Sequence, residues 1–217
     1  MDDPGLFETI HSTRAMRRLK PDPVPDALVA KVLAAATAAP SGGNRQNWRF
    51  IVVKDPALKS KIAAYYRRTF EAILLPHYLT GPLPPGVTAD ENTRQLAAVR
   101  YLTDHFHEAP VWIVACAEDG GNVSMTSGAS IYPAVQNILL ACRALGLGAT
   151  LTTRHTLQYG AEVDALLGLP PTAHSYAIVP IGYPLGQFGP TRRVPLEAVV
   201  YEDSWGSPAS FLGSTDA

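Results

Sequence analysis

Residues 33–53 read LAAATAAPSGGNRQNWRFIVV and predict, within one short stretch, the end of a helix, a polar loop and a buried strand. Alanine and leucine favour helix as far as Pro40, whose ring cannot continue one. The β-branched run 49–53 predicts a strand. Between them, small residues in 40–48 allow a ligand to approach the backbone, although an ordinary glycine-rich turn remains an alternative. The side chains that offer hydrogen bonds in this loop are Ser41, Asn44 and Gln46.

Elements of both kinds alternate along the rest of the chain, which predicts an α/β or α+β organisation in a single domain over 1–217. Segment 76–86 (PHYLTGPLPPG) holds four prolines and two glycines, so we expect a turn-rich excursion there and a lid over 76–90. We expect helices from Asp26 towards Pro40 and over 56–78, 90–106, 130–145 and 162–167, and strands over 49–53, 111–117, 148–152 and 175–181.

The composition is that of a folded chain with no bulk electrostatic partner. Of the 217 residues, 47% are hydrophobic and 17% charged, and the net charge is -1, which argues against a disordered acidic chain and a basic nucleic-acid binder. The charge is uneven, with 12 basic and 7 acidic residues up to Glu71, so an anion is expected near the N-terminal third. Cys116 and Cys142 lie in apolar runs and are expected to be buried free thiols. The start MDDPGLFETI lacks the features of a signal peptide, and no apolar run is long enough to span a membrane, so a cytoplasmic location is expected.

A basic segment precedes the first expected helix of this core. Residues 14–18 read RAMRR and lie in a proline-rich stretch, so their side chains are expected to project from an irregular connection. Guanidinium groups bind phosphate through paired donors, and several on one loop can fix a phosphate-bearing cofactor. A solvated surface loop is the competing interpretation.

Four motifs together resemble the FMN-dependent nitroreductases. TRAMRRLKPDPVP (13–25) and LAAATAAPSGGNRQNWRFIVV (33–53) resemble that family's arginine-rich opening and its APSSxNxQPWxF loop. YPAVQNILLACRALGLGATLTT (132–153) resembles its central dimer helix with the strand that follows. IGYPLGQFGPTRRVPLEAV (181–199) resembles its C-terminal cofactor-binding strand and tail.

The resemblance implies the nitroreductase α+β fold, in which helices flank a central mixed, mainly antiparallel sheet. It also implies a homodimer with FMN at the subunit interface and a C-terminal extension over the partner. Arg14 would hold the FMN phosphate together with Arg193, for which Arg192 could substitute, and Arg18 would approach the pyrimidine edge of the flavin. Pro40, Ser41, Gly42 and Asn44 would reach the flavin from the other subunit. The remaining residues expected at the cofactor are Ala15, Met16, Leu151, Thr152 and Thr153.

The activity implied is transfer of electron pairs from NADPH or NADH through FMN to a nitroaromatic, quinone or similar small-molecule acceptor, in alternating half-reactions. No side chain acts as nucleophile, because the chemistry belongs to the flavin. Enone reduction, dehalogenation and flavin fragmentation on the same scaffold stay open, as does a non-catalytic FMN-sequestering role. No metal site, nucleic acid or membrane partner is expected.

The chain departs from the family pattern at positions that bear on the substrate. Asn47 stands where proline is usual, Gly42 where a second serine is common, and Thr153-Arg154 where some members have Glu-Gly beside the flavin. His155 is expected to be a surface residue, with a place in the lining of the pocket as the alternative. His105 and His107 fall on different helix faces, which disfavours a metal site.

Overall fold

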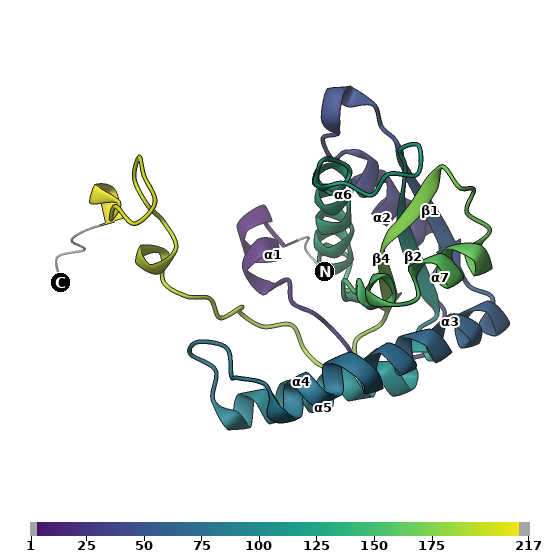
Figure 1. Ribbon diagram of the computed structural model, residues 1–217, viewed down its shortest axis with the longest axis horizontal. Helices are drawn as coiled ribbons and strands as arrows, with labels where there is room; N and C mark the ends of the chain where they lie inside the picture. Colours follow the sequence, from purple (N-terminus) through teal and green to yellow (C-terminus); the bar gives the residue numbers. More distant parts are fainter. Residues whose placement is uncertain (1–3, 213–217) are drawn as a thin grey trace.

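The computed structural model describes residues 4–212 and places one four-stranded sheet at its centre (Figure 1). The strands are β1 (Trp48–Val53), β2 (Val111–Glu118), β3 (Gly148–Ala149) and β4 (Ala173–Gly182). Their order is β1-β2-β4-β3, and all three pairings are antiparallel. The long middle pair β2 and β4 carries one register irregularity, between Ala115 and Cys116. The mainly antiparallel sheet expected from the sequence is confirmed.

Helices cover both faces of this sheet. The helices on one face are α2 (Asp26–Thr37) and α6 (Met125–Ala144), and those on the other are α3 (Pro56–Thr69), α5 (Ala89–His105) and α7 (Gly160–Leu167). Two elements prolong α3, namely a single π-helical turn (Phe70–Leu74) and α4 (Leu75–Thr80). The described chain also contains α1 (Leu6–Ser12) and short 3-10 turns at Gly42–Asn44, Phe106–Glu108, Arg154–Leu157, Leu196–Ala198 and Ser210–Leu212.

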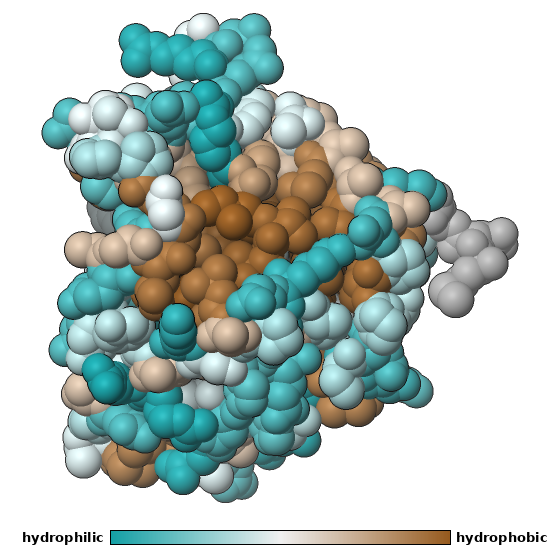
Figure 2. Space-filling view, turned by 90° about the vertical axis from the view of Figure 1, so that its right-hand side faces the viewer, coloured by the Kyte–Doolittle hydropathy of each residue, from teal (hydrophilic) through white to brown (hydrophobic). Residues whose placement is uncertain are grey.

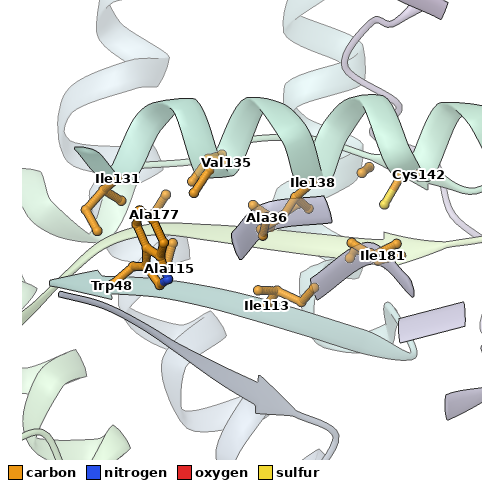
Figure 3. Close-up of a cluster of buried hydrophobic side chains, with 14 of the residues drawn as sticks. Ala36, Trp48, Ile113, Ala115, Ile131, Val135, Ile138, Cys142, Ala177 and Ile181 are labelled. Carbon is orange, nitrogen blue, oxygen red and sulfur yellow. The ribbon is translucent and has the colours of Figure 1, made fainter. Parts of the chain in front are cut away.

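Strand β2 shows why the sheet is buried on both sides. Its residues alternate between two hydrophobic clusters, with Ile113 and Ala115 packed towards α2 and α6, and Trp112 and Val114 packed towards α3 and α5. Figure 3 shows the first cluster, in which Ile138 of α6 lies over the sheet. A strand buried on both faces reads as a continuous apolar run, and that explains the segment VWIVACA. Cys116 and Cys142 are buried free thiols, as expected.

Segment 76–80 is a correction to the sequence prediction. The expected helix 56–78 overlapped the expected turn-rich segment 76–86, and the structure continues the helix: α4 extends through Thr80, and only the residues after it form the loop. Pro76 lies in the first turn of α4, directly after the π-turn Phe70–Leu74. The next helix, α5, starts at Thr88 with a capping box closed by Glu91. Closure of 76–90 as a lid remains a prediction.

Other expected boundaries shift by a few residues. Helix α6 begins five residues before the expected Ser130, because Ser124 caps it by accepting the N–H of Ser127. The strand expected over 148–152 is shorter, since β3 ends at Ala149 and Thr152 only forms an isolated bridge to Ile178. Gly146 has a φ of 72°, which ends the helical backbone after α6 and lets the chain turn into β3.

The tail beyond β4 leaves the sheet and extends away from the helical layers (Figure 1). It contains two 3-10 turns and an isolated bridge between Tyr201 and Pro208. Trp205 is 92% exposed, and further apolar side chains of the tail are also open to solvent. The tail therefore contributes little to the core of its own chain.

Candidate cofactor site

A polar cavity of about 510 Å³ lies where the N-terminal segment, α6, the strand region after it and the tail meet. We call it the arginine cavity. Arg14, Arg17 and Arg193 line it, with Gln136 and Leu139 contributed by α6. Its remaining lining residues are Ile10, His11, Thr13, Ala15, Ala149, Thr150, Leu151 and Thr191.

Backbone contacts fix the two segments that carry these arginines. The N–H of Met16 donates to the carbonyl of Ala149 at 2.9 Å, and the Met16 side chain is buried. The N–H of Thr191 donates to the carbonyl of His11 at 2.8 Å, which holds the tail against the end of α1. Prolines keep 21–25 out of a helix, so the basic segment stays extended between these anchors. The structure thus brings together Arg14 and Arg193, which the sequence analysis had paired.

The electrostatic character of the arginine cavity follows from its lining. Three arginines line it, and no Asp or Glu is found among the described residues that line it. Guanidinium groups recognise phosphate and carboxylate through paired N–H donors. The arrangement is suited to an anion that carries more than one negative charge.

Arg192 and Arg193 differ although they are neighbours in sequence. Arg193 lines the arginine cavity, and its Nη1 donates to the carbonyl of Arg192 at 2.7 Å. Arg192 has a side chain that is 94% exposed and lies 3.5 Å from a carboxylate oxygen of Glu91. Of the two, Arg193 therefore occupies the position from which a phosphate can be held.

Arg17 and Arg18 also separate, in a way that the sequence analysis missed. Arg17 lines the arginine cavity and a second cavity beside it. Arg18 is exposed, and its guanidinium lies 5.1 Å from the ring centre of Tyr101 on α5. The motif RAMRR signals several arginines on an irregular loop, but which of them turns inward depends on how Met16 is anchored. The position of Arg18 relative to a bound cofactor remains a prediction.

The second cavity, of about 340 Å³, lies between the helices α3 to α5 and segment 150–157, and we call it the Arg154 cavity. It shares Arg17, Thr150 and Leu151 with the arginine cavity, so the two are contiguous. Its wall on this side includes Thr152 and Thr153. All three residues predicted from 151–153 therefore lie along the two joined cavities.

The loop that carries Pro40, Ser41, Gly42 and Asn44 lies apart from these cavities in the same chain. Gly42 lines a different hollow of about 690 Å³, and its N–H donates to Oγ of Ser130 on α6 at 3.1 Å. Ser41 Oγ accepts the N–H of Gln46 at 3.0 Å. Pro40, Gly42 and Asn44 are exposed. Contact of this loop with a cofactor held by another subunit remains a prediction.

His155 is a correction, because it is buried and not a surface residue. Its side chain is 1% exposed, and Nε2 lies 3.0 Å from Oγ of Ser175. Ser175 donates its hydroxyl proton to Asp164, so Nε2 of His155 must donate to Ser175. Burial lowers the pKa of His155 to about 4, which keeps the ring neutral. Residues 153–156 read TRHT, and the neighbours of His155 are Arg154, which is buried, and Thr156, which is exposed. Such a polar run has no hydrophobic periodicity, so the burial of His155 could not be predicted from the sequence.

Metal binding and membrane insertion find no support in the described chain. Residues 4–212 hold no group of three or more His, Cys, Asp or Glu side chains placed to bind a metal ion. Among the helices described, none has the length and apolar character that crossing a membrane requires.

The chain is similar in sequence to a protein-family model and to several known proteins. A protein-family model described as the nitroreductase family matches residues 10–183. An NADH dehydrogenase of Thermus thermophilus is 33% identical over 201 residues, which cover 86% of this chain and 90% of that protein. Iodotyrosine deiodinase 1 of Rattus norvegicus is 28% identical and covers 82% of this chain, which spans 62% of the rat protein.

A solved structure gives the same result at the level of the fold. The crystal structure of an oxidised iodotyrosine deiodinase bound to FMN and 3-iodo-L-tyrosine superposes with a TM-score of 0.68 and 26% identity. The superposition covers 92% of this chain and 99% of that one. The family model covers most of the chain, and the fold agrees, so this chain belongs to the nitroreductase family.

Proposed function

We propose that this chain is an FMN-dependent oxidoreductase that takes electron pairs from NADH or NADPH and passes them to a nitroaromatic, quinone or similar electron-poor acceptor. The observation that carries the proposal is the arginine cavity, in which Arg14, Arg17 and Arg193 converge. The family membership adds weight, as do the words NADH dehydrogenase and FMN in the names of relatives.

The residues of the cavity fit the cofactor. A phosphate monoester needs paired cationic donors, and three arginines supply them without a competing carboxylate among the described lining residues. The backbone of Ala149 to Thr153 runs along the joined cavities, where a planar ring system has both polar and apolar neighbours. When bound there, FMN would accept a hydride from the nicotinamide and return two electrons to the acceptor.

The role of the protein in this reaction is to bind, orient and exclude water. For a nitro group, each two-electron turnover consumes R–NO₂, NAD(P)H and one proton and yields R–NO, NAD(P)⁺ and water. Arg14 and Arg193 would fix the phosphate end, and Leu151, which lines both cavities, would lie beside the ring end. Thr152 and Thr153 would lie at the edge where the ring meets the Arg154 cavity. Fixing both ends holds the reacting atoms in line, which lowers the entropic part of the barrier.

A homodimer completes this proposal. The exposed loop with Pro40, Ser41, Gly42 and Asn44 would then reach the cofactor of the other subunit, and the tail would lie over the partner. Exposed apolar surface supports it, since Trp205 and Phe211 of the tail are 92% and 72% exposed. Figure 2 shows an apolar area on another side of the molecule, framed by polar residues. Exposed apolar surface of this extent is typical of association.

Reductive dehalogenation is a second candidate for the same site. The rat relative is an iodotyrosine deiodinase, and the structure with an iodotyrosine bound is 26% identical to this chain. Removing iodide from an aryl iodide by two-electron reduction consumes Ar–I and a reductant that supplies a hydride equivalent, and yields Ar–H and I⁻. Comparing 3-iodotyrosine with a nitroaromatic acceptor separates the two candidates.

The test is an absorbance spectrum of the purified protein, followed by anaerobic titration with NADPH and then NADH. Flavin bands that bleach with a nicotinamide and return with a nitroaromatic or a quinone support the proposal and identify the donor. A protein that takes up no FMN overturns the cofactor assignment. Flavin that neither nicotinamide bleaches overturns the oxidoreductase assignment and favours a sequestering protein.

A further inference from the structure

Arg154 is a buried cation without a carboxylate partner. Its side chain is 6% exposed, at the start of a 3-10 turn that follows the strand region 148–152. Nη1 donates to Oγ1 of Thr103 at 2.7 Å, while Nε has no hydrogen-bond partner within the described chain. Leaving a guanidinium buried with an unmet donor is costly, so such groups are usually paired with an anion. Among the described residues, none supplies such an anion to Arg154.

The two side chains that enclose the guanidinium do not neutralise it. Its carbon lies 3.7 Å from the ring centre of Tyr66 and 5.3 Å from that of Phe70. Burial raises the pKa of Tyr66, so the phenol is protonated and acts through its ring face. Thr103 already donates its own hydroxyl proton to the carbonyl of Val99, and so it accepts from Arg154 without carrying charge.

Arg154 is one of the residues that line the Arg154 cavity. Arg17 and His77 also line it, and no Asp or Glu occurs among its described lining residues. Ile73, Leu74 and Leu157 give it apolar walls. The cavity thus combines cationic groups with space for an apolar body, and it joins the arginine cavity.

We propose that the Arg154 cavity binds the electron acceptor and selects acceptors that carry a carboxylate on an aromatic body, with Arg154 pairing with the carboxylate. This rests on the proposed function, in which the joined arginine cavity holds the cofactor. A guanidinium also pairs with phosphate, so the 2′-phosphate of NADPH is the other anion to compare with the carboxylate. The volume of about 340 Å³ is at the small end of ligand pockets and suits a substituted benzoate better than the adenosine end of a dinucleotide.

The experiment compares 4-nitrobenzoate with its neutral counterpart 4-nitrobenzamide, each titrated calorimetrically into the oxidised protein as purified. We expect the wild-type protein to bind the carboxylate at least tenfold more tightly. Arg154→Met should bring the two ligands within twofold of each other, and Arg154→Lys should keep part of the preference. Arg100→Met, which removes an exposed arginine from α5, is the matched control and should leave the preference unchanged.

Several outcomes overturn the proposal. Equal binding of the two ligands by the wild-type protein does so without any variant, as does an unchanged preference in a folded Arg154→Met protein. A parallel titration with NADPH and NADH covers the other anion source. If Arg154→Met removes a preference for NADPH and leaves 4-nitrobenzoate binding intact, the guanidinium serves the 2′-phosphate and the proposal is wrong.

The result is separable from the proposed function. If the protein takes up no FMN, the same titrations on the flavin-free protein still show whether Arg154 selects the carboxylate. If FMN is bound and bleached by a nicotinamide but the carboxylate is not preferred, the proposed function stands and the proposal about carboxylate-bearing acceptors is wrong. Circular dichroism and a thermal melt confirm that each variant is folded, and if Arg154→Met is not, the wild-type comparison and Arg154→Lys decide.

Discussion

The guanidinium of Arg154 stacks on the ring of Tyr66, with 3.7 Å between the guanidinium carbon and the ring centre. Both side chains are almost fully buried, and together they form the floor of the cavity between α3, α5 and segment 150–157. A stack of this kind holds the guanidinium plane in one orientation. It does not supply the counter-charge that a buried cation needs.

Arg154→Met should therefore lower the free energy of unfolding by less than about 1 kcal/mol, or raise it. Replacing an uncompensated buried charge by an apolar side chain of similar length is often neutral or stabilising. Tyr66→Ala should cost about 3–5 kcal/mol, because it empties a core position. Urea denaturation at pH 7 measures both. A loss of more than about 2 kcal/mol in Arg154→Met would show that the guanidinium is a structural group.

The double variant Arg14→Ala/Arg193→Ala should fold and purify without flavin, because it removes two of the three guanidinium groups of the arginine cavity. Arg192→Ala is the control and should retain FMN, since that side chain is exposed and lies beside Glu91. The flavin absorbance per chain is the measurement. One FMN per chain in the double variant would place the phosphate elsewhere.

Arg17→Ala should weaken FMN binding by roughly ten- to a hundredfold, the range of a charged hydrogen bond lost. Arg18→Ala should instead lower the reduction potential of the bound flavin if Arg18 approaches the pyrimidine edge, because a cation there stabilises the reduced form. Fluorescence titration and a spectroelectrochemical titration measure the two effects. An Arg18→Ala protein with an unchanged potential would contradict that placement.

Acid should destabilise the protein through His155. The pKa is about 4 in the folded chain, against 6.5 as the ordinary value, so between those values the unfolded chain binds more protons. Stability is complete above pH 6.5 and falls by up to about 3 kcal/mol as the pH drops towards 4. In His155→Gln, whose amide nitrogen can still donate to Ser175, this part of the pH dependence should vanish. Urea denaturation at several pH values tests it, with His107→Gln at an exposed site as the control. An unchanged pH profile in His155→Gln would show that other groups dominate.

The double variant Leu196→Asp/Val199→Asp should break up the proposed homodimer, because both tail residues are exposed and apolar in the single chain. Sedimentation velocity should then shift from twice 23.3 kDa towards 23.3 kDa. Leu79→Asp, an equally exposed apolar position on α4, is the control and should sediment like the wild-type protein. A wild-type protein that sediments as a monomer would contradict the dimer itself.

Local sequence was sufficient to place two strands. The run VWIVACA at 111–117 predicted β2, which is buried on both faces, because local preference and burial agree there. RFIVV at 49–53 predicted most of β1, but β1 is an edge strand and only partly buried, with Arg49 and Val52 exposed. The motifs at 13–25, 33–53, 132–153 and 181–199 determined the family, which the match over 10–183 confirmed. These motifs could be interpreted without coordinates because each is contiguous.

Only the tertiary structure decided which polar side chains turn inward. The sequence nominated Arg18 but not Arg17, and it assigned His155 to the surface, whereas Arg17 lines both cavities and His155 is buried. The sequence did not predict that the helix continues past Pro76 to Thr80, because a proline alone does not reveal the π-turn before it. In each case the outcome depends on contacts between segments far apart in the chain, such as Met16 with Ala149 or His155 with Ser175. Local sequence carries the preferences of single segments, and packing between segments determines which side chain of a polar run is desolvated.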